Sequence, residues 1–171
     1  MSILKVARLG HPVLRQRATD LEIADIKAGR FENLIQDMFE TMDAYEGVGL
    51  AGPQVHLPHR IFVYALNQSV AKRREVAPVE PGVMFNATYE ILGNGRITDW
   101  EGCLSVPFLG GETPRASKIR VRGIGRDGLP QDLQITGYTA RIFQHEIDHT
   151  DGHVYLDRMP DLTTLGYTVV L

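Results

Sequence analysis

Apolar residues near the start of the chain recur at the spacing of an α-helix. From about Asp25 to Tyr45 they follow the i, i+3, i+4, i+7 pattern of a helix with one buried face. The stripe consists of Phe31, Leu34, Ile35, Met38, Phe39, Met42 and Tyr45. Methionine and phenylalanine in such a stripe are far more typical of a hydrophobic core than of a cofactor site, so we predict a core helix that ends at Glu46-Gly47.

The middle of the chain alternates short apolar runs with turn signals. Strands are predicted over residues 60–66, 83–92, 96–100, 119–125 and 133–136, and a loop over 67–81. Asn94-Gly95 and Asp127-Gly128 each predict a tight turn between paired strands. A second helix is predicted from about Gly137 to Asp151, because glycine commonly follows the last residue of a helix. This order of elements indicates an α+β fold, with largely antiparallel short-stranded sheets around the late, central helix.

The composition is typical of a globular protein. The chain has 171 residues, 43% of them hydrophobic and 23% charged, and we predict one domain over residues 1–171. A net charge of −3 argues against a broad nucleic-acid-binding surface. The sequence shows no bilayer-spanning stretch, no apolar segment of a signal peptide, and too few cysteines for an intrachain disulfide. We therefore expect a cytoplasmic monomer, or a mature organellar form, that binds neither nucleic acid nor a membrane.

Two histidines stand four positions apart on the late helix, in the HExxH run His145-Glu146-Ile147-Asp148-His149. Residues i and i+4 share a helix face, so both imidazoles can reach one divalent metal ion. Glu146 lies about 100° further round the helix, where it can take a proton from activated water. The same pattern also occurs by chance on solvated helix faces. Apolar Phe143 and Ile147 favour a partly buried helix instead, where two unpartnered histidines would be costly.

The two histidines leave a catalytic metal site one protein ligand short, because such sites usually have three protein ligands and one open position. The remaining candidates are acidic residues, four other histidines and the single cysteine, Cys103. A lone cysteine is more often a small buried apolar residue than a ligand. Its neighbour Gly102 allows close approach of the backbone. Spacing alone therefore leaves the third ligand open.

Three segments of the chain together resemble the peptide deformylase family. They are Gly47 to Gln54, Glu101 to Ser105, and Gln144 to His149, in matching order and spacing. The resemblance covers nearly the whole chain. It implies a metal-dependent hydrolase that removes the formyl group from N-formylmethionine at the N-terminus of new polypeptides. It also implies that Cys103, His145 and His149 hold one divalent metal, Fe²⁺ by expectation, with Zn²⁺, Ni²⁺ or Co²⁺ as substitutes, since this donor set suits several late divalent metals.

The resemblance implies roles for further residues of the site. Glu146 would accept the proton of the attacking water and later pass it to the departing amine. The side-chain amide of Gln54 and the backbone N–H of Leu104 would donate to the oxyanion. Without the resemblance, Gln54 would be interpreted as an exposed polar residue after a turn. The residues implied for substrate binding are Val48, Gly49 and Gly102, through their backbone, and Tyr138 and Ile142, in an apolar methionine pocket.

The chain departs from the family pattern in two places that concern substrates and partners. Gly110 stands where many relatives have an arginine, near the outer part of the substrate site. The tail from Asp161 to Leu171 has a strand-like run, Tyr167 to Val170, and lacks the basic helix that some relatives use to dock on the ribosome. We therefore expect N-formylmethionyl nascent peptides as substrates, close to the ribosome but without direct docking.

Three other hypotheses account for the sequence less well. A zinc protease needs a third ligand downstream of the helix motif, and His153, Asp157 and Asp161 follow no matching pattern. A non-catalytic binding relative predicts the loss of Glu146 or of a ligand, and all of these residues are present. A structural metal site is usually closed by four protein ligands, whereas three candidates are found here.

Overall fold

The described part of the chain, residues 2–168 of a computed structural model, consists of four α-helices, four 3₁₀ helices and eight strands. The α-helices are α1 (Ile23–Lys27), α2 (Glu32–Ala44), α3 (Gln68–Arg73) and α4 (Gly137–Thr150). The 3₁₀ helices are η1 (Pro12–Arg15), η2 (Gly52–Val55), η3 (Tyr155–Arg158) and η4 (Leu162–Thr164). The strands are β1 (Gly49–Ala51), β2 (Ile61–Leu66), β3 (Val79–Ile91), β4 (Arg96–Cys103), β5 (Val106–Ala116), β6 (Lys118–Ile124), β7 (Pro130–Thr136) and β8 (Gly166–Tyr167).

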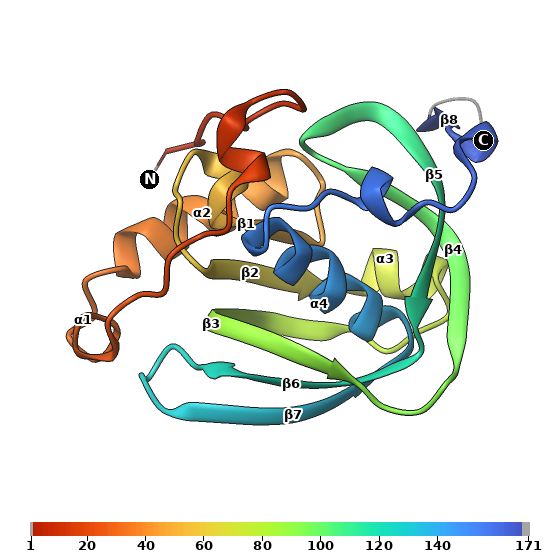
Figure 1. The fold of residues 1–171 in the computed structure, drawn as a ribbon. Helices are drawn as coiled ribbons and strands as arrows, with labels where there is room; N and C mark the ends of the chain where they lie inside the picture. The colour runs from red at the N-terminus through yellow and green to blue at the C-terminus, as the bar shows by residue number, and fades with distance from the viewer. Residues whose placement is uncertain (1, 169–171) are drawn as a thin grey trace.

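The strands form two sheets, and helix α4 contacts both. One sheet has the strand order β1-β2-β3-β6-β7, and the other has the order β4-β5-β8. Each pair of neighbouring strands is antiparallel. Figure 1 shows α4 near the middle of the molecule, and it contacts β1, β2, β3, β6 and β7 of the larger sheet and β5 of the smaller one. The predicted α+β fold, with antiparallel sheets around a central helix, is confirmed.

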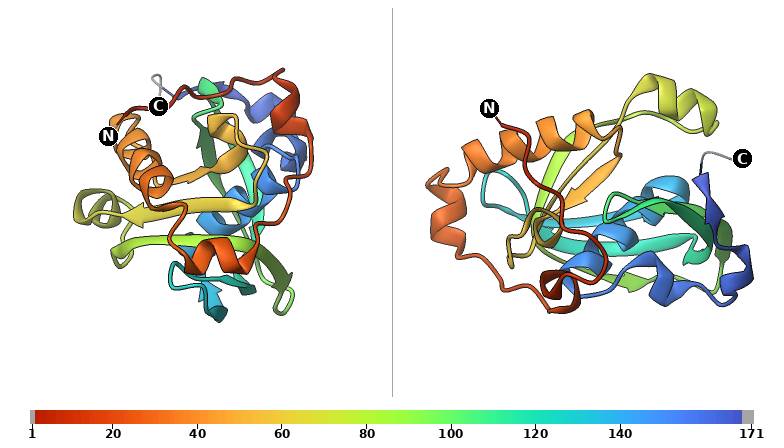
Figure 2. Two further views of the ribbon diagram at one scale, coloured as in Figure 1. Left: turned by 90° about the vertical axis from the view of Figure 1, so that its left-hand side faces the viewer. Right: turned by 90° about the horizontal axis from the view of Figure 1, so that it is seen from above.

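Strands β1 and β2 of the larger sheet are buried on both faces, because α2 covers one face and α4 covers the other (Figures 1 and 2), whereas β6 and β7 expose alternate side chains. Side chains alternate across a strand, so neighbouring residues of β2 reach different cores. Ile61 packs with Met38 of α2, whereas Phe62 packs with Phe143 of α4. Burial of both faces explains why the apolar run of β2 is continuous rather than alternating. The methionine and phenylalanine stripe is a core feature, as predicted, except at Tyr45, which follows the end of α2 and is exposed.

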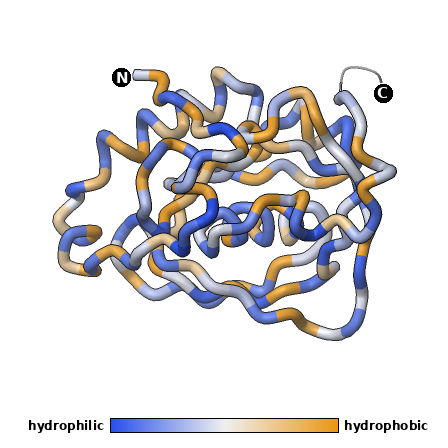
Figure 3. The backbone as a smooth tube through the Cα atoms, turned by 45° about the horizontal axis from the view of Figure 1, so that its top comes forward, coloured by the Kyte–Doolittle hydropathy of each residue, from blue (hydrophilic) through white to orange (hydrophobic). Residues whose placement is uncertain are grey.

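Apolar segments are short and interleaved with polar ones along the chain (Figure 3). Among the described residues, no helix combines the length and the apolar character needed to cross a membrane.

The helix predicted from about Asp25 to Tyr45 is wrong in one respect, because the structure divides it into α1 and α2. Gly29 has a φ of 68°, a left-handed conformation that ends a helix and that glycine adopts without steric cost. The break follows from a local glycine that the apolar periodicity does not register. The loop predicted over 67–81 is also too long, since Asn67 caps the short helix α3 and β3 begins at Val79.

The hairpin predicted at Asn94-Gly95 is wrong, whereas the turn at Asp127-Gly128 joins paired strands as predicted. Strands β3 and β4 flank Asn94-Gly95 but belong to different sheets, with β3 paired to β6 and β4 paired to β5. The segment is a corner at which the chain leaves one sheet for the other. Near the C-terminus, the predicted strand Tyr167 to Val170 overlaps β8 at Tyr167, and its residues 169–170 lie outside the described part.

Candidate active site

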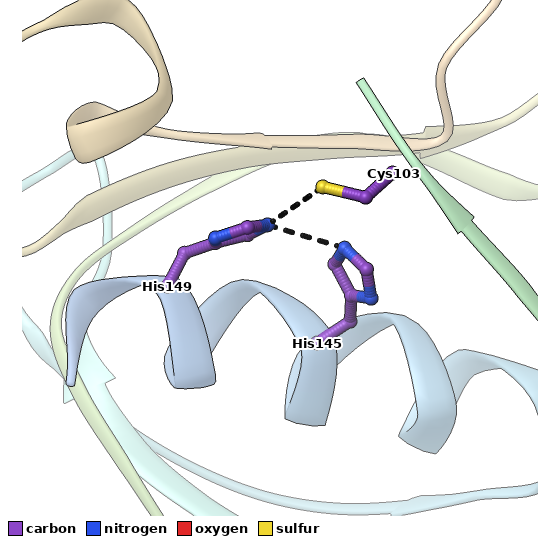
Figure 4. A group of neighbouring side chains, drawn as sticks. All are labelled: Cys103, His145 and His149. Carbon is purple, nitrogen blue, oxygen red and sulfur yellow. Dashed lines mark hydrogen bonds between the residues drawn. The ribbon is translucent and has the colours of Figure 1, made fainter. Parts of the chain in front are cut away.

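Three potential metal ligands meet between α4 and the end of β4 (Figure 4). The Sγ of Cys103 lies 3.2 Å from Nε2 of His149, which in turn lies 3.2 Å from Nε2 of His145. The three ligand atoms all lie within 4.8 Å of one another. His145 and His149 are one helical turn apart, as the i, i+4 spacing predicts. The opposite face of α4 carries Phe143 and Ile147 into the core against the larger sheet, which fixes the orientation of the histidine face.

Cys103 is placed by the tight turn between β4 and β5. It pairs with Val106, and the register shifts between Gly102 and Cys103. Two N–H donors point towards its sulfur, the backbone of Ser105 at 3.4 Å and Nε2 of Gln54 at 3.5 Å. These two contacts fix the direction in which the sulfur points, towards the two histidines.

The donor set fits a divalent metal ion. His145 directs Nδ1 at Oε2 of Glu101, 3.0 Å away, which leaves Nε2 to face the other two ligands. Burial and the neighbouring His145 lower the pKa of His149 well below its ordinary value, so that its imidazole stays neutral. Burial would lower the pKa of His145, but hydrogen bonds to Cys103 and Glu101 raise it well above its ordinary value, so a bound metal would take the place of a proton on this ring. One thiolate and two imidazoles would then form a three-ligand set of the catalytic kind, with an open position. No fourth His, Cys, Asp or Glu of the described residues joins the group.

A buried network of ion pairs supports the histidines from behind. Arg115 makes two hydrogen bonds to the carboxylate of Glu101 and one to Oδ2 of Asp148. Arg141 also donates to Glu101, and Arg158 donates to both oxygens of Asp148. Burial alone would raise the pKa of Glu101, but hydrogen bonds from His145 and Arg115 outweigh it and hold that pKa far below its ordinary value. Glu101 is therefore an anion that orients the ring of His145.

Glu146 points towards β1 and is almost fully buried, at 3% exposure. Burial raises the pKa of Glu146 to about 7. Its Oε2 has no hydrogen-bond partner among the described residues. Gly49 makes its position possible, because a Cβ on Gly49 would lie 2.3 Å from Oε1 of Glu146. A buried carboxyl group with a free oxygen and a pKa near neutrality is suited to exchange protons with a bound molecule.

Gln54 is buried rather than exposed, which corrects the interpretation that its sequence position alone would suggest. Its Oε1 accepts a hydrogen bond from the backbone N–H of Ala51, 2.8 Å away. This bond turns the amide nitrogen towards Cys103 and towards Oγ of Ser105, at 3.4 Å. Leu104 follows Cys103 in the same turn. The structure therefore places both predicted oxyanion donors beside the candidate metal ligands.

The predicted substrate residues divide between two strand edges and one apolar cluster. Gly49 belongs to β1 and Gly102 to β4, and a Cβ on Gly102 would make only ordinary contacts, at 3.7 Å and beyond. Val48, Tyr138 and Ile142 pack in one cluster with residues of α3. Tyr138 also lines a cavity of about 440 Å³ between α3, β4 and α4. Val48, Tyr138 and Ile142 are thus brought together and Gly49 follows Val48 in the chain, whereas Gly102 belongs to the other sheet.

Sequence reasoning missed Arg115 and Asp148, which hold the network behind the ligands. It also missed Gln144, whose amide makes hydrogen bonds to both the N–H and the C=O of Ala116 and so ties α4 to β5. The aspartate inside the histidine motif was a signal, because it shares the motif with the ligands. The sequence around Arg115 gave no comparable signal, since an arginine in a strand is ordinarily a surface residue.

The family model described as polypeptide deformylase matches residues 3–164. A peptide deformylase of Leptospira biflexa serovar Patoc is 35% identical over 167 residues, which cover 98% of this chain and 93% of that protein. The crystal structure of peptide deformylase from Thermus thermophilus has a TM-score of 0.78 at 38% identity, with 94% of this chain and 87% of that chain covered.

A Met-Ala-Ser-bound crystal structure of class I type b peptide deformylase from Acinetobacter baumannii has a TM-score of 0.85 at 29% identity. The match covers 92% of this chain and 98% of that chain.

Proposed function

The chain belongs to the peptide deformylase family of metal-dependent hydrolases, which remove the N-formyl group from nascent polypeptides, and from this membership we propose a role for each residue of its site. The observation that carries the proposal is the position of Glu146. In the sequence, Glu146 stands between His145 and His149, which form the candidate metal site with Cys103. Its carboxyl group is buried, and Oε2 has no hydrogen-bond partner among the described residues.

Cys103, His145 and His149 are the residues that would hold the metal, and we propose Fe²⁺ as the resident ion. A thiolate with two imidazoles also suits Zn²⁺, Ni²⁺ and Co²⁺. A divalent metal in such a site supplies Lewis acidity and lowers the pKa of a coordinated water. Glu101 keeps the ring of His145 in the tautomer that presents Nε2, and its own charge is balanced by Arg115.

Glu146 acts as the proton carrier. It takes the proton of the water that attacks the formyl carbon and delivers that proton to the amine that leaves. A carboxyl group with a pKa of about 7 is matched to both steps, since it can accept and donate near neutral pH. The C–N bond of the formamide breaks, so that formate and a free N-terminal amine are the products.

Gln54 and Leu104 stabilise the negative charge that develops on the formyl oxygen. The amide of Gln54 is oriented by its bond to Ala51, and the N–H of Leu104 lies in the turn that carries Cys103. Donors fixed in place before the reaction are worth about 10²–10³ in rate each. Leu104 belongs to the turn that carries the ligand Cys103, and the amide of Gln54 points at the sulfur of that cysteine.

The substrate proposed for this site is the N-formylmethionyl end of a nascent peptide. The backbone of Val48, Gly49 and Gly102 would pair with the peptide as an added strand, which suits an enzyme that acts on many sequences. Tyr138 and Ile142, in the apolar cluster with Val48, would receive the methionine side chain. A relative that binds Met-Ala-Ser supports a peptide with an N-terminal methionine. We further propose a cytoplasmic monomer, acting near the ribosome without direct docking.

The test is formate release from a short N-formylmethionyl peptide, with protein purified without oxygen and loaded with iron. The Glu146→Ala variant should keep one metal ion per chain and lose turnover. Glu80→Ala is the control, because Glu80 is exposed on β3. Metal-dependent turnover that survives in Glu146→Ala would contradict the proposed proton carrier. Loss of the metal in that variant would show that Glu146 is a ligand instead.

A further inference from the structure

A short segment near the N-terminus, residues 7–9, makes hydrogen bonds to the two segments that carry the proposed oxyanion donors Gln54 and Leu104. The N–H of Ala7 donates to the backbone oxygen of Gln54, and the N–H of Leu9 donates to the backbone oxygen of Ser105, both at 2.8 Å. Between them, the guanidinium of Arg8 donates to the backbone oxygen of Leu104. Three consecutive residues thus join η2 to the turn between β4 and β5, which are far apart in sequence.

Within that turn, Leu104 has fewer hydrogen-bond restraints than Ser105, whose N–H points at the sulfur of Cys103 and whose carbonyl oxygen accepts from Leu9. The N–H of Leu104 donates to no described residue, as a group that is to bind an oxyanion requires. The side chain of Leu104 packs at the border of the core that α2 covers. The carbonyl oxygen is the other polar group of Leu104 that can restrain the orientation of this residue. Arg8 donates a hydrogen bond to that oxygen.

Preorganised donors accelerate a reaction only if they already point to where negative charge develops. A small misplacement of a donor is costly, because the interaction depends on its distance and angle. Arg8 is exposed to solvent and makes this bond across 96 residues of sequence. Its contact is with the turn, not with the core, so it contributes to the geometry of Leu104 more than to the stability of the fold.

We propose that Arg8 is a positioning residue, which orients the Leu104 turn through its bond to the Leu104 carbonyl and so aligns the oxyanion-binding N–H. This inference rests on the proposed function, in which Leu104 donates to the oxyanion. Because that interaction forms in the transition state, loss of Arg8 lowers kcat and leaves KM little changed.

The test compares Arg8→Ala, Arg8→Lys and Arg17→Ala in the iron-loaded enzyme, with an N-formylmethionyl tripeptide as substrate. Arg17 is a matched control, because it is exposed near the same end of the chain and its ion pair with Asp151 is long, at 4.0 Å. We expect kcat of Arg8→Ala to fall roughly tenfold, less than for loss of a donor itself. Arg8→Lys should recover part of this loss, because lysine keeps a charged donor. Arg17→Ala should match the wild type.

A second readout does not depend on turnover. In the zinc-loaded protein, the amide resonances of Leu104 and Ser105 should shift in Arg8→Ala and stay unchanged in Arg17→Ala, with the thermal midpoint of both within a few degrees of wild type. An unchanged kcat in Arg8→Ala, or a rise in KM alone, overturns the positioning role and leaves the proposed function intact. Absence of formate release from the wild type and the control alike contradicts the proposed function as well.

Discussion

The carboxyl group of Glu146 occupies the space that a Cβ on Gly49 would need. An ideal Cβ at residue 49 would lie 2.3 Å from Oε1 and 2.7 Å from the carboxyl carbon of Glu146. Gly49 belongs to the strand β1, and Glu146 belongs to α4, which packs against it. The conformation of Glu146 therefore depends on the absence of a side chain on a strand almost a hundred positions away in the sequence.

The Gly49→Ala variant is expected to lose activity while it retains its metal. The new methyl group must displace the carboxyl group, and a displaced proton carrier costs about 10²–10⁴ in rate. We expect kcat to fall by about that range and the metal content to stay at one ion per chain. Gly166→Ala is the control, because a Cβ there would make only an ordinary contact, at 3.7 Å from Trp100. Full activity in Gly49→Ala would contradict the role given to Glu146 in its present position.

Arg115 should be the most costly of the arginines to remove. It is 3% exposed and pairs with two buried carboxylates, Glu101 and Asp148. An Arg115→Met variant leaves both charges without this partner, which typically costs about 3–5 kcal/mol. Arg120→Met is the matched control, because Arg120 pairs with Asp132 on the surface, where an ion pair contributes at most about 1 kcal/mol. Urea unfolding of the wild type, the two single variants and the double variant would measure the free energy lost at each position. An equal loss of stability in Arg115→Met and Arg120→Met would contradict the importance of the buried network.

The same network makes the fold sensitive to acid. Burial raises the pKa of Asp148, but the hydrogen bond from Arg158 and the charge of Arg115 outweigh it, so the pKa lies below its ordinary value. A carboxyl group whose folded pKa is lowered contributes stability that is present above its unfolded pKa, about 4, and is lost as the pH falls through the folded value. The metal-free protein should therefore lose stability steeply below about pH 4.

Asp148→Asn isolates this contribution. The variant should be less stable than the wild type at neutral pH, and its free energy of unfolding should depend less on pH below about pH 4. Urea unfolding at several pH values measures the slope. Asp132→Asn is the control, since Asp132 is on the surface and its ion pairs are exposed. Identical slopes in Asp148→Asn and the wild type would show that Asp148 is not held as an anion by the fold.

Local patterns predicted the ligand-bearing part of the site because its determinants are local. The spacing of His145 and His149 is a property of one helix, and the apolar face that seats α4 is visible in the same fifteen residues or so. The third ligand was different. Cys103 comes from the end of strand β4, and only the resemblance, not the spacing, brought it into the site.

The rest depends on contacts that no local pattern encodes. The need for glycine at position 49 comes from Glu146, and the burial of Arg115 comes from Glu101 and Asp148. The same limit explains the failed hairpin at Asn94-Gly95, because a turn signal specifies a change of direction and not the strand that will be the partner. Tertiary packing decided each of these features.

Gly110, where many relatives have an arginine, is constrained by its own surroundings. A Cβ at this position would lie 2.2 Å from Nε1 of Trp100 and 2.8 Å from the backbone oxygen of Glu101. Trp100 lies on the neighbouring strand, two residues before the Gly102 that pairs with Gly110, and its indole fills the space that a side chain at position 110 would need. In this chain, Trp100 and the backbone at Glu101 leave no room for a side chain at position 110.

The Gly110→Arg variant is therefore expected to lose stability, by about 1–3 kcal/mol, the usual cost of overpacking. In the double variant with Trp100→Ala the indole clash is removed, and the clash with the backbone oxygen of Glu101 remains. We expect the double variant to recover part of the loss, so that the two substitutions are not additive. A double-mutant cycle from urea unfolding measures the coupling. A coupling free energy near zero would mean that Trp100 does not determine what position 110 accepts, and that the backbone at Glu101 alone excludes the larger side chain.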